Sequence, residues 1–365
     1  MELNPDEILF NFRYNIIYYI TACITLFFVA EFYIKNKSHT KAQNFFLILI
    51  FLCLIILFGT RGYNVGTDTL NNIKYFTGRV QIKSFSELND LGLYTISILL
   101  QRISNNITDF LIVLAILYIV PFYISFRNLK LKNPLIFFFC IFSMFFFKGM
   151  GINIQKQGLA FSFFILGVTF IFKNIKFFGY LLFGLAFLFH ASIIIPISIF
   201  FVSFKIKKTN WIFIIYLLST LLALVNFNLN NILSQIPIVN ILTESRLDTY
   251  YTDKGNYKIG FRPEFWIFNT IFTIIGYITY RNIQKFNSNF LNDNYKTFYV
   301  AYVLLSSFFF LMFSARFSDR FGLMSWLLIP FLLMPYLQNN TKVKFLNTLT
   351  VYILCVILFI AFKYI

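Results

Sequence analysis

Long apolar runs, separated by short polar connectors, make up most of the chain. A transmembrane helix needs about 20 predominantly apolar residues, and sometimes as few as about 17. The pattern predicts an all-α, polytopic integral membrane protein with about 11–12 transmembrane helices, because a helix satisfies its own backbone hydrogen bonds inside a bilayer. The predicted spans are residues 14–34, 43–59, 109–127, 134–147, 153–172, 177–204, 211–226, 264–280, 297–314, 317–337 and 345–362.

The connectors predict how these spans are oriented. Several connectors are rich in lysine and arginine and contain almost no acid, which is typical of the cytoplasmic side. Both termini and two long connectors, 60–108 and 227–263, then face outward from a single transmembrane domain, 1–365. The connectors assigned to the cytoplasm contain Lys35, Lys37 and Lys41; Arg127, Lys130 and Lys132; Lys173 and Lys176; Lys205, Lys207 and Lys208; Arg281, Lys285 and Lys296; and Lys342 and Lys344.

Two stretches depart from a simple succession of spans. The run 177–204 has cytoplasmic connectors at both ends, so it cannot cross the bilayer only once. We expect a short, re-entrant-like helical hairpin that turns at His190–Ser192, which a bilayer tolerates where the hairpin lines a cavity. Residues 92–103 form a shorter apolar stretch inside the first outward connector. They predict a half-helix that lies at the interface.

Composition and charge narrow the class further. The chain is 59% hydrophobic and 12% charged, with a mean hydropathy of +0.74, whereas soluble domains contain roughly 25% charged residues. The net charge of +17 is spread over connectors and forms no basic stripe, which argues against nucleic acid as a partner. The acidic start of the chain predicts no cleavable signal peptide. The four cysteines are scattered in apolar runs and are expected to be small buried hydrophobic residues.

The stretch RGYNVGTDT, residues 61–69, is the first candidate for chemistry. Arg61 follows the 43–59 span directly. The glycines that follow it permit tight turns and let backbone N–H groups approach a ligand closely. Two alternatives stay open from these residues alone: Arg61 extends to lipid head groups, and Asp68 caps a short helix.

Three polar residues, Asn153, Lys156 and Gln157, stand at the start of the 153–172 span. Their spacing of i, i+3 and i+4 predicts that they share one helical face. Polar groups on a spanning helix are costly unless that face meets water or polar partners. We therefore expect this face to bind substrate.

A second charged turn, ARFSDRF, separates the 297–314 and 317–337 spans. Arg316 and Arg320 are four residues apart, which predicts a common helical face. Two guanidinium groups on one face repel each other unless an anion lies between them, and arginine fits phosphate oxygens well. The alternative is that Asp319 partly neutralises them.

The remaining candidates are a histidine and a long outward loop. His190 lies at the expected hairpin turn, where it can donate to a phosphate or act as a base. The alternative is a structural histidine that is satisfied by its neighbours. The loop 227–263 contains Arg246, Asp248, Tyr250 and Tyr251, residue types that also bind sugars, although loop residues are usually solvated. If Arg61, Lys156, Arg246, Arg316 and Arg320 converge, they form an outward cationic pocket for a lipid diphosphate.

Four stretches resemble those of one family, the EpsG-type polysaccharide polymerases, relatives of the Wzy O-antigen polymerases. RGYNVGTDTLNNIKYF resembles the family's R-x-x-x-VGTDT-x-x-Y turn, and NIQKQGLAFSFFILGVTFI resembles its N-x-x-RQ-x-[IL]A helix. LAFLFHASIIIPI resembles its FH-x-S hairpin, and ARFSDRFGLMSWLLIP is similar to its late arginine segment. The matches follow the family's order. Two departures are Lys156, where the family usually has arginine, and the loop 227–263, which has no match.

The resemblance implies a glycosyltransferase of the bacterial inner membrane that polymerises surface polysaccharide (O-antigen, capsule or exopolysaccharide). It would join oligosaccharide repeat units carried on undecaprenyl diphosphate at the outward face. A chain-length regulator and a flippase of the same pathway are expected partners, and no cofactor or metal is expected. The predicted catalytic residues are His190, Asp68, Arg316 and Arg320, and the predicted substrate-binding residues that lie in matched stretches are Arg61, Asn153, Lys156 and Gln157. Arg246 and Tyr250 of the unmatched loop are added as substrate-binding residues from their residue types alone.

Other membrane functions remain as alternatives. A flippase or transporter for lipid-linked sugars has a similar composition, but it is expected to carry charges along a central path and to show repeat symmetry. An O-antigen ligase-type transferase would use the same donor, and the order of the motifs is the reason to prefer a polymerase. A membrane O-acyltransferase is disfavoured because His190 stands alone.

Overall fold

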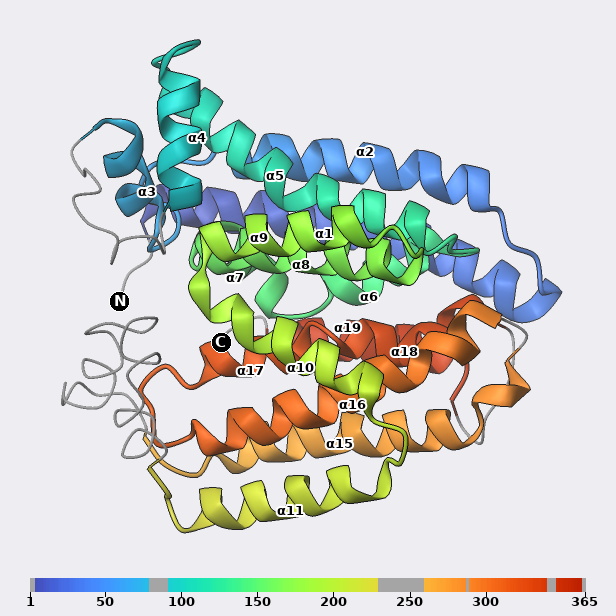
Figure 1. Ribbon diagram of the computed structural model, residues 1–365. Helices are drawn as coiled ribbons and strands as arrows, with labels where there is room; N and C mark the ends of the chain where they lie inside the picture. Colours follow the sequence, from blue (N-terminus) through green and yellow to red (C-terminus); the bar gives the residue numbers. More distant parts are fainter. Residues whose placement is uncertain (1–3, 79–90, 229–258, 287–288, 340–345, 363–365) are drawn as a thin grey trace. The chain divides into compact units, whose positions relative to one another are not determined.

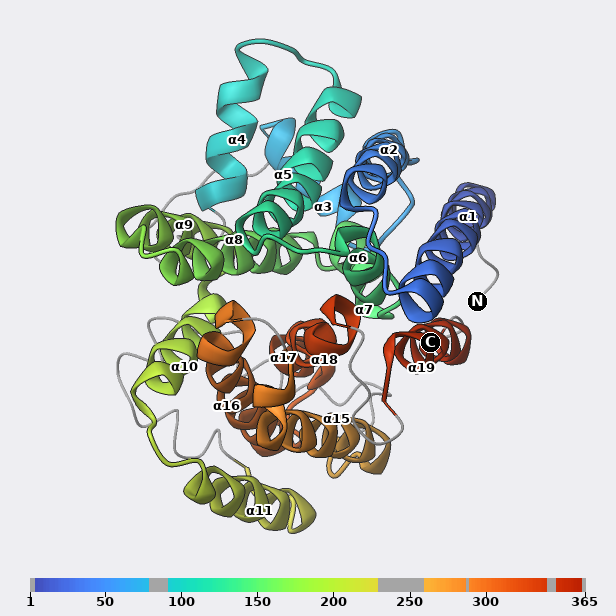
Figure 2. The same cartoon turned by 90° about the vertical axis from the view of Figure 1, so that its right-hand side faces the viewer.

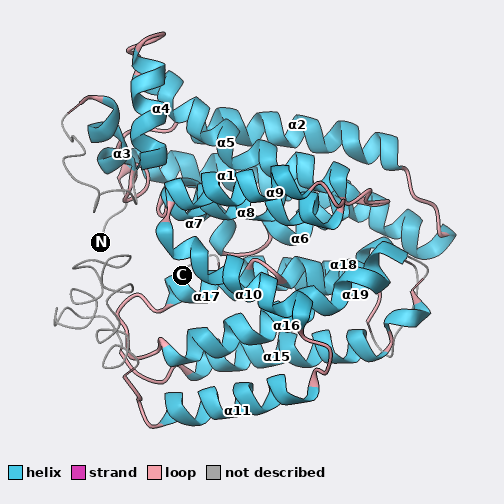
Figure 3. Cartoon of the chain, viewed as in Figure 1, coloured by secondary structure: helices cyan, strands magenta, loops and turns pink. Residues whose placement is uncertain are grey.

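The computed structural model describes residues 4–78, 91–228, 259–286, 289–339 and 346–362 (Figure 1). Within these ranges the regular structure is helical, and no strand occurs among them (Figure 3). The prediction of an all-α fold is confirmed. The described chain divides into two compact units, Met1–Ile193 with Tyr336–Ile365 (unit 1) and Ile194–Pro335 (unit 2).

Unit 1 is built from long apolar helices and a few short ones. Its centre is α6, every residue of which is buried. A helix that is apolar on all sides belongs in such a core. The helices of unit 1 are α1 (Pro5–Lys35), α2 (Thr40–Gly59), α3 (Thr69–Phe76), α4 (Leu91–Gln101), α5 (Ile107–Asn128), α6 (Pro134–Phe142), α7 (Phe146–Ile152), α8 (Gln155–Phe172), α9 (Lys176–Phe189) and α19 (Thr348–Ala361).

Helices α8 and α9 approach each other closely at two glycines. A Cβ placed on Gly167 would lie 3.1 Å from the carbonyl oxygen of Gly179, and a Cβ on Gly179 would lie 3.1 Å from that of Gly167. Side chains of Phe183 and Ile171 would be closer still. Small residues let helix backbones pack tightly inside a membrane, so these glycines fix the α8–α9 pair.

Several predicted spans appear as long apolar helices. By length and composition, α1, α2, α5, α8 and the segment Asp319–Gln338 are able to cross a membrane, and α6 with α7 would make a sixth span. The chain is therefore a multi-pass membrane protein. Other predicted spans form shorter apolar helices, among them α9, α19 and α11 (Asn210–Leu224). The count of about 11–12 crossings stays a prediction.

Two interruptions define how the chain departs from straight spans. The predicted span 134–147 is bent: α6 ends at Phe142 and the chain turns by 77° before α7 continues to Ile152. The run 177–204 is interrupted as expected, because α9 ends at Phe189 and a 3-10 turn, Ala191–Ile193, precedes the next helix.

The connectors of unit 1 are sorted between its two ends. The loops after α1, α5 and α8, which carry lysines assigned to the cytoplasm, lie together at one end (Figure 1). The ends of α2, α7 and α9, the start of α1 and the end of α19 lie at the other (Figure 1). Helix α4 is the half-helix expected at 92–103. It is seen lengthwise in Figure 2, whereas α2 and α6 are seen nearly end-on.

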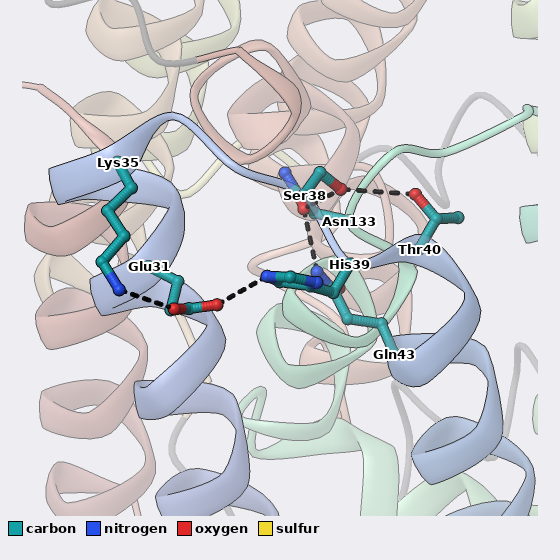
Figure 4. Close-up of polar contacts among 7 residues, drawn as sticks. All are labelled: Glu31, Lys35, Ser38, His39, Thr40, Gln43 and Asn133. Carbon is teal, nitrogen blue, oxygen red and sulfur yellow. Dashed lines mark hydrogen bonds and ion pairs between the residues drawn. The ribbon is translucent and has the colours of Figure 1, made fainter.

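Polar contacts join the connectors at the lysine-rich end (Figure 4). The Ser38 hydroxyl donates to Oδ1 of Asn133 (2.8 Å), and Nε2 of Gln43 donates to the same oxygen (2.9 Å). Glu31 pairs with Lys35 (3.1 Å) and His39 (2.6 Å). The hydrogen bonds to Asn133, which is fully buried, join the α1–α2 connector to the start of α6.

Unit 2 packs its helices around α16. Their bounds are α10 (Ile194–Lys205), α11, α15 (Pro263–Arg281), α16 (Asn289–Leu311) and α17 (Asp319–Trp326), and α18 (Ile329–Gln338) contains the boundary with unit 1. Helices α11 and α16 end, and α15 and α17 begin, at the same end of unit 2 (Figure 1).

A buried asparagine joins three of these helices. Oδ1 of Asn269 in α15 accepts hydrogen bonds from Ser306 (2.9 Å) and Tyr302 (3.4 Å) of α16 and from Ser325 (3.1 Å) of α17. Its Nδ2 donates to the carbonyl of Phe265 (2.9 Å). Interhelical hydrogen bonds of this kind hold membrane helices in register, so Asn269 joins the last turn of α17 to α15 and α16.

Candidate functional site

Arg61 lies just beyond α2, with only 4% of its surface exposed. Its Nε donates to Oγ1 of Thr69 (3.0 Å), its Nη2 donates to Oε1 of Gln155 (3.1 Å), and its Nη1 donates to the carbonyl of Phe58. These acceptors belong to the end of α2, the start of α3 and the start of α8. A single guanidinium group therefore joins three segments that are distant in sequence.

All of these acceptors are neutral oxygens. Among the described residues Arg61 makes no ion pair. Burial lowers the pKa of Arg61 from its usual value of 12.5 to about 10, so the side chain still carries its charge at neutral pH. Unit 1 thus contains a buried positive charge at the end of the bundle where α2 ends and α8 begins.

Gln155, which the sequence analysis did not select, is the central acceptor of this cluster. Its Oε1 accepts from Arg61 and also from Nδ2 of Asn72 (2.8 Å). Both amides are buried, and neither Nε2 of Gln155 nor Oδ1 of Asn72 has a hydrogen-bond partner among the described residues. The available signal was the polar string NIQKQ at the start of an apolar helix, in which Gln155 stands between two selected residues.

The GTDT turn is seated on the end of α7. Gly66 has a φ of 85°, and a Cβ at this position would lie 2.5 Å from the carbonyl oxygen of Ile152. The backbone N–H of Thr67 donates to Oδ1 of Asn153 (3.2 Å), and the Thr67 hydroxyl donates to the carbonyl of Asn153 (3.2 Å). At Gly66, the close backbone approach is thus to the chain's own helix. Asp68 occupies the N-cap position of α3, but its side chain makes no capping hydrogen bond.

The predicted common face of Asn153, Lys156 and Gln157 is wrong for Asn153. Helix α8 begins at Gln155, because Ile154, with φ −122° and ψ 50°, interrupts the helical path. Asn153 instead belongs to the end of α7. Lys156 places its ammonium group 4.6 Å from the ring centre of Tyr75 in α3, and Gln157 is buried in the first turn of α8.

His190 lies at the break after α9. Its backbone is extended, its N–H donates to the carbonyl of Ala186 (3.1 Å), and its own carbonyl accepts from Ile193 (3.1 Å). The side chain is half-buried. These backbone hydrogen bonds terminate α9, and the conformation of the turn sets the position of the imidazole.

The second charged turn belongs to unit 2. Arg316 lies in the turn before α17, and Arg320 lies in the first turn of that helix. The predicted common helical face is therefore wrong, because the backbone between them adopts a positive φ of 55° at Phe317. The two guanidinium carbons nevertheless lie near the same ring: that of Arg316 is 5.0 Å, and that of Arg320 is 4.9 Å, from the ring centre of Phe317.

The predicted site residues thus fall into separate groups. Unit 1 holds Arg61, Asp68, Asn153, Lys156, Gln157 and His190, whereas unit 2 holds Arg316, Asp319 and Arg320. Within unit 1 the structure joins Asn153 to the turn that carries Asp68, and within unit 2 it joins Arg316 to Arg320 through Phe317. Arg246 and Tyr250 lie outside the described residues. The convergence of all five cations on one pocket stays a prediction.

Comparison with known protein families assigns the chain to one of them. A family model described as the EpsG family matches residues 44–365, which include every candidate residue above. The chain belongs to the EpsG family. The resemblance to polysaccharide polymerases of this type is confirmed, and EpsG membership indicates a membrane protein of polysaccharide biosynthesis. No curated protein and no solved structure matches the chain.

Proposed function

We propose that the protein is a membrane glycosyltransferase that polymerises oligosaccharide repeat units carried on undecaprenyl diphosphate. The product is a surface polysaccharide, and the reaction takes place at the outward face of the bacterial inner membrane. Membership of the EpsG family is the observation that carries this proposal. The half-buried arginine pair of unit 2 supports it, because a departing diphosphate requires cationic groups.

The reaction transfers the growing glycan from its lipid diphosphate to a hydroxyl of an incoming lipid-linked repeat. The acceptor oxygen bonds to the anomeric carbon while the bond from that carbon to the diphosphate oxygen breaks. The leaving diphosphate takes the electron pair, and Arg316 and Arg320 stabilise its charge. A base takes the acceptor's proton, and His190 and Asp68 are the two candidates.

The other residues serve substrate binding in this proposal. Asn153, Lys156 and Gln157 belong to the polar end of unit 1, and Arg246 and Tyr250 belong to the outward loop that would contact the sugars. Arg61 contributes a positive charge while its three hydrogen bonds hold α2, α3 and α8. A flippase and a chain-length regulator of the same pathway are the proposed partners, and no cofactor is part of the proposal.

Deleting the gene and separating the surface glycan on a gel tests the proposal against its rivals. Loss of a polymerase leaves surface glycan with a single repeat unit. Loss of a flippase leaves no exported glycan, and loss of a ligase leaves long glycan that remains on the lipid carrier. Either of the last two patterns would refute the polymerase assignment.

Two substitutions test the arginine pair directly. We expect Arg316→Ala and Arg320→Ala each to abolish long chains, because each removes a cation that stabilises the leaving diphosphate. A single lost electrostatic contact of this kind costs about 10²–10³-fold in rate. Membrane levels of both variants, measured by immunoblot, should stay normal. Long chains of normal length in both variants would remove these residues from the mechanism.

A further inference from the structure

Phe317 has a backbone conformation that is unusual for its side chain. A positive φ is unfavourable for bulky residues, because the Cβ then crowds the following carbonyl oxygen. The other described non-glycine residues with positive φ are Lys130 and three asparagines, and each directly follows, or lies two residues beyond, the end of a helix. A left-handed residue is common at such ends. Phe317 lies well beyond the end of α16 and before α17, so helix termination does not explain it.

The ring of Phe317 is where the two arginines of the turn meet. The guanidinium carbons of Arg316 and Arg320 lie 5.0 Å and 4.9 Å from the ring centre. An aromatic face attracts cations within about 6 Å of its centre. The ring therefore offsets part of the repulsion between two cations that the turn places beside it.

The backbone of the turn holds this arrangement in place. The N–H of Arg320 donates to the carbonyl of Phe317 (3.0 Å), and Asp319 begins α17 directly after the turn. Asn269 in turn fixes α17 through Ser325. Arg316 and Arg320 are thus connected by a turn with a left-handed residue at Phe317, and not by a regular helix. This turn sets the distance between them.

We propose that Phe317 is a positioning residue that holds Arg316 and Arg320 together as one binding site for a diphosphate group. This inference deepens the proposed function and rests on it for the identity of the anion. Phe317 acts through the two arginines, and its aromatic ring is the feature that matters. A glycine would accept the same backbone conformation more easily, but it would supply no ring.

The test compares four variants of Phe317 in the full-length protein, and a fifth, Phe317→Ala, serves as the reference for thermal unfolding. Phe317→Tyr and Phe317→Trp keep an aromatic ring, whereas Phe317→Leu keeps an apolar side chain and a strained backbone but removes the ring. Phe317→Gly removes both the ring and the strain. Phe204→Leu, which removes an exposed ring from α10 elsewhere in unit 2, is the control. Binding of inorganic pyrophosphate to purified protein is measured by titration, and glycan chain length is measured in cells.

We expect Phe317→Leu and Phe317→Gly to weaken pyrophosphate binding by about tenfold and to shorten the glycan, because the ring no longer holds the cations together. Phe317→Tyr and Phe317→Trp should stay within about twofold of the wild type. Wild-type affinity in Phe317→Leu would overturn the proposal. So would a loss in both aromatic variants as large as that in Phe317→Leu.

Two further outcomes separate this proposal from the proposed function. If Arg316→Ala and Arg320→Ala abolish long chains while Phe317→Leu behaves as wild type, the positioning role fails and the polymerase assignment stands. If pyrophosphate binding depends on Phe317 but both arginine variants still make long chains, the positioning role stands and the proposed catalytic site fails.

Phe317→Gly should also unfold at a temperature no lower than Phe317→Ala, because glycine relieves the positive φ. The opposite order would contradict the backbone part of the argument.

Discussion

The cluster around Arg61 and the turn that contains Arg316 and Arg320 differ in the surroundings of their positive charges. Arg61 is almost completely buried and donates to three oxygens of its own chain, contributed by α2, α3 and α8. Arg316 and Arg320 are half-buried and lie beside one ring in a strained turn. The first arrangement joins helices, and the second presents two cations together. In the sequence, both look like an arginine after a membrane span.

The partners of a guanidinium group therefore indicate whether an arginine stabilises the fold or binds substrate. A buried arginine whose donors meet fixed oxygens is needed for the fold, because removing it takes one donor away from each of those oxygens. Arg316 and Arg320, which lie half-buried beside one ring, are instead the pair proposed to meet the substrate. Substitution should then change stability at Arg61 and substrate handling at Arg316 and Arg320.

The largest stability effect is expected at Arg61. Arg61→Lys should lose about 3 kcal/mol, and Arg61→Ala at least as much, because a single ammonium group cannot reach three acceptors in different helices. Thermal unfolding of the purified protein in detergent measures the loss. Arg102→Ala, which removes an exposed arginine just after α4, is the control and should change little. An unchanged Arg61→Lys variant would abolish the distinction drawn between the two clusters.

A smaller effect is expected from Asn269 in unit 2. Asn269→Leu should cost about 2 kcal/mol, since it removes the acceptor shared by Ser306, Ser325 and Tyr302. The same variant should shorten the glycan if the position of α17 sets the arginine turn. Ser306→Ala, which removes one of the donors, serves as the matched control and should cost less. Equal stability and chain length in Asn269→Leu and wild type would show that the turn does not depend on this network.

The smallest effect is expected at Lys156, which lies 4.6 Å from the ring centre of Tyr75. Tyr75→Leu should cost about 0.5–1 kcal/mol through the lost cation–π contact, whereas Tyr75→Phe should be neutral. Lys156→Arg should retain the contact and the charge. Unfolding midpoints for these three variants measure the effect. A Tyr75→Phe variant that loses as much as Tyr75→Leu would mean that the hydroxyl, and not the ring face, is important.

Much of the helical architecture could be predicted from hydrophobic patterning, because a bilayer demands long apolar helices. The predicted spans 43–59 and 109–127 lie inside α2 and α5, and the break at His190 was expected from length and charge. The bend between α6 and α7 was not expected, because Ser143–Phe145 contains no glycine or proline that would indicate it. The run remains uniformly apolar through the bend, and tertiary packing decides where such a helix breaks.

The candidate site was harder to predict than the fold. The arginines stood out because charge is rare in this chain, but their partners did not. Gln155 meets Arg61 only after α2, α3 and α8 are assembled, and helical spacing alone pointed to Asn153 instead. The role of Phe317 depends on one backbone angle, and phenylalanine is the most abundant residue in the sequence. Periodicity assumes regular helices, so it fails at turns, where both sites lie.

The bond between Arg61 and Gln155 spans 94 residues of sequence, which has a consequence for biogenesis. A ribosome that adds about 5–20 residues per second needs roughly 5–20 seconds to make the intervening segment. During that interval α2 can already be inserted, and Arg61 has the Phe58 carbonyl and the Thr69 hydroxyl within reach but not yet Gln155. The nascent chain must therefore keep this residue at the membrane surface until α8 arrives. Final burial of the guanidinium is a late step of assembly, reached after most of unit 1 has been synthesised.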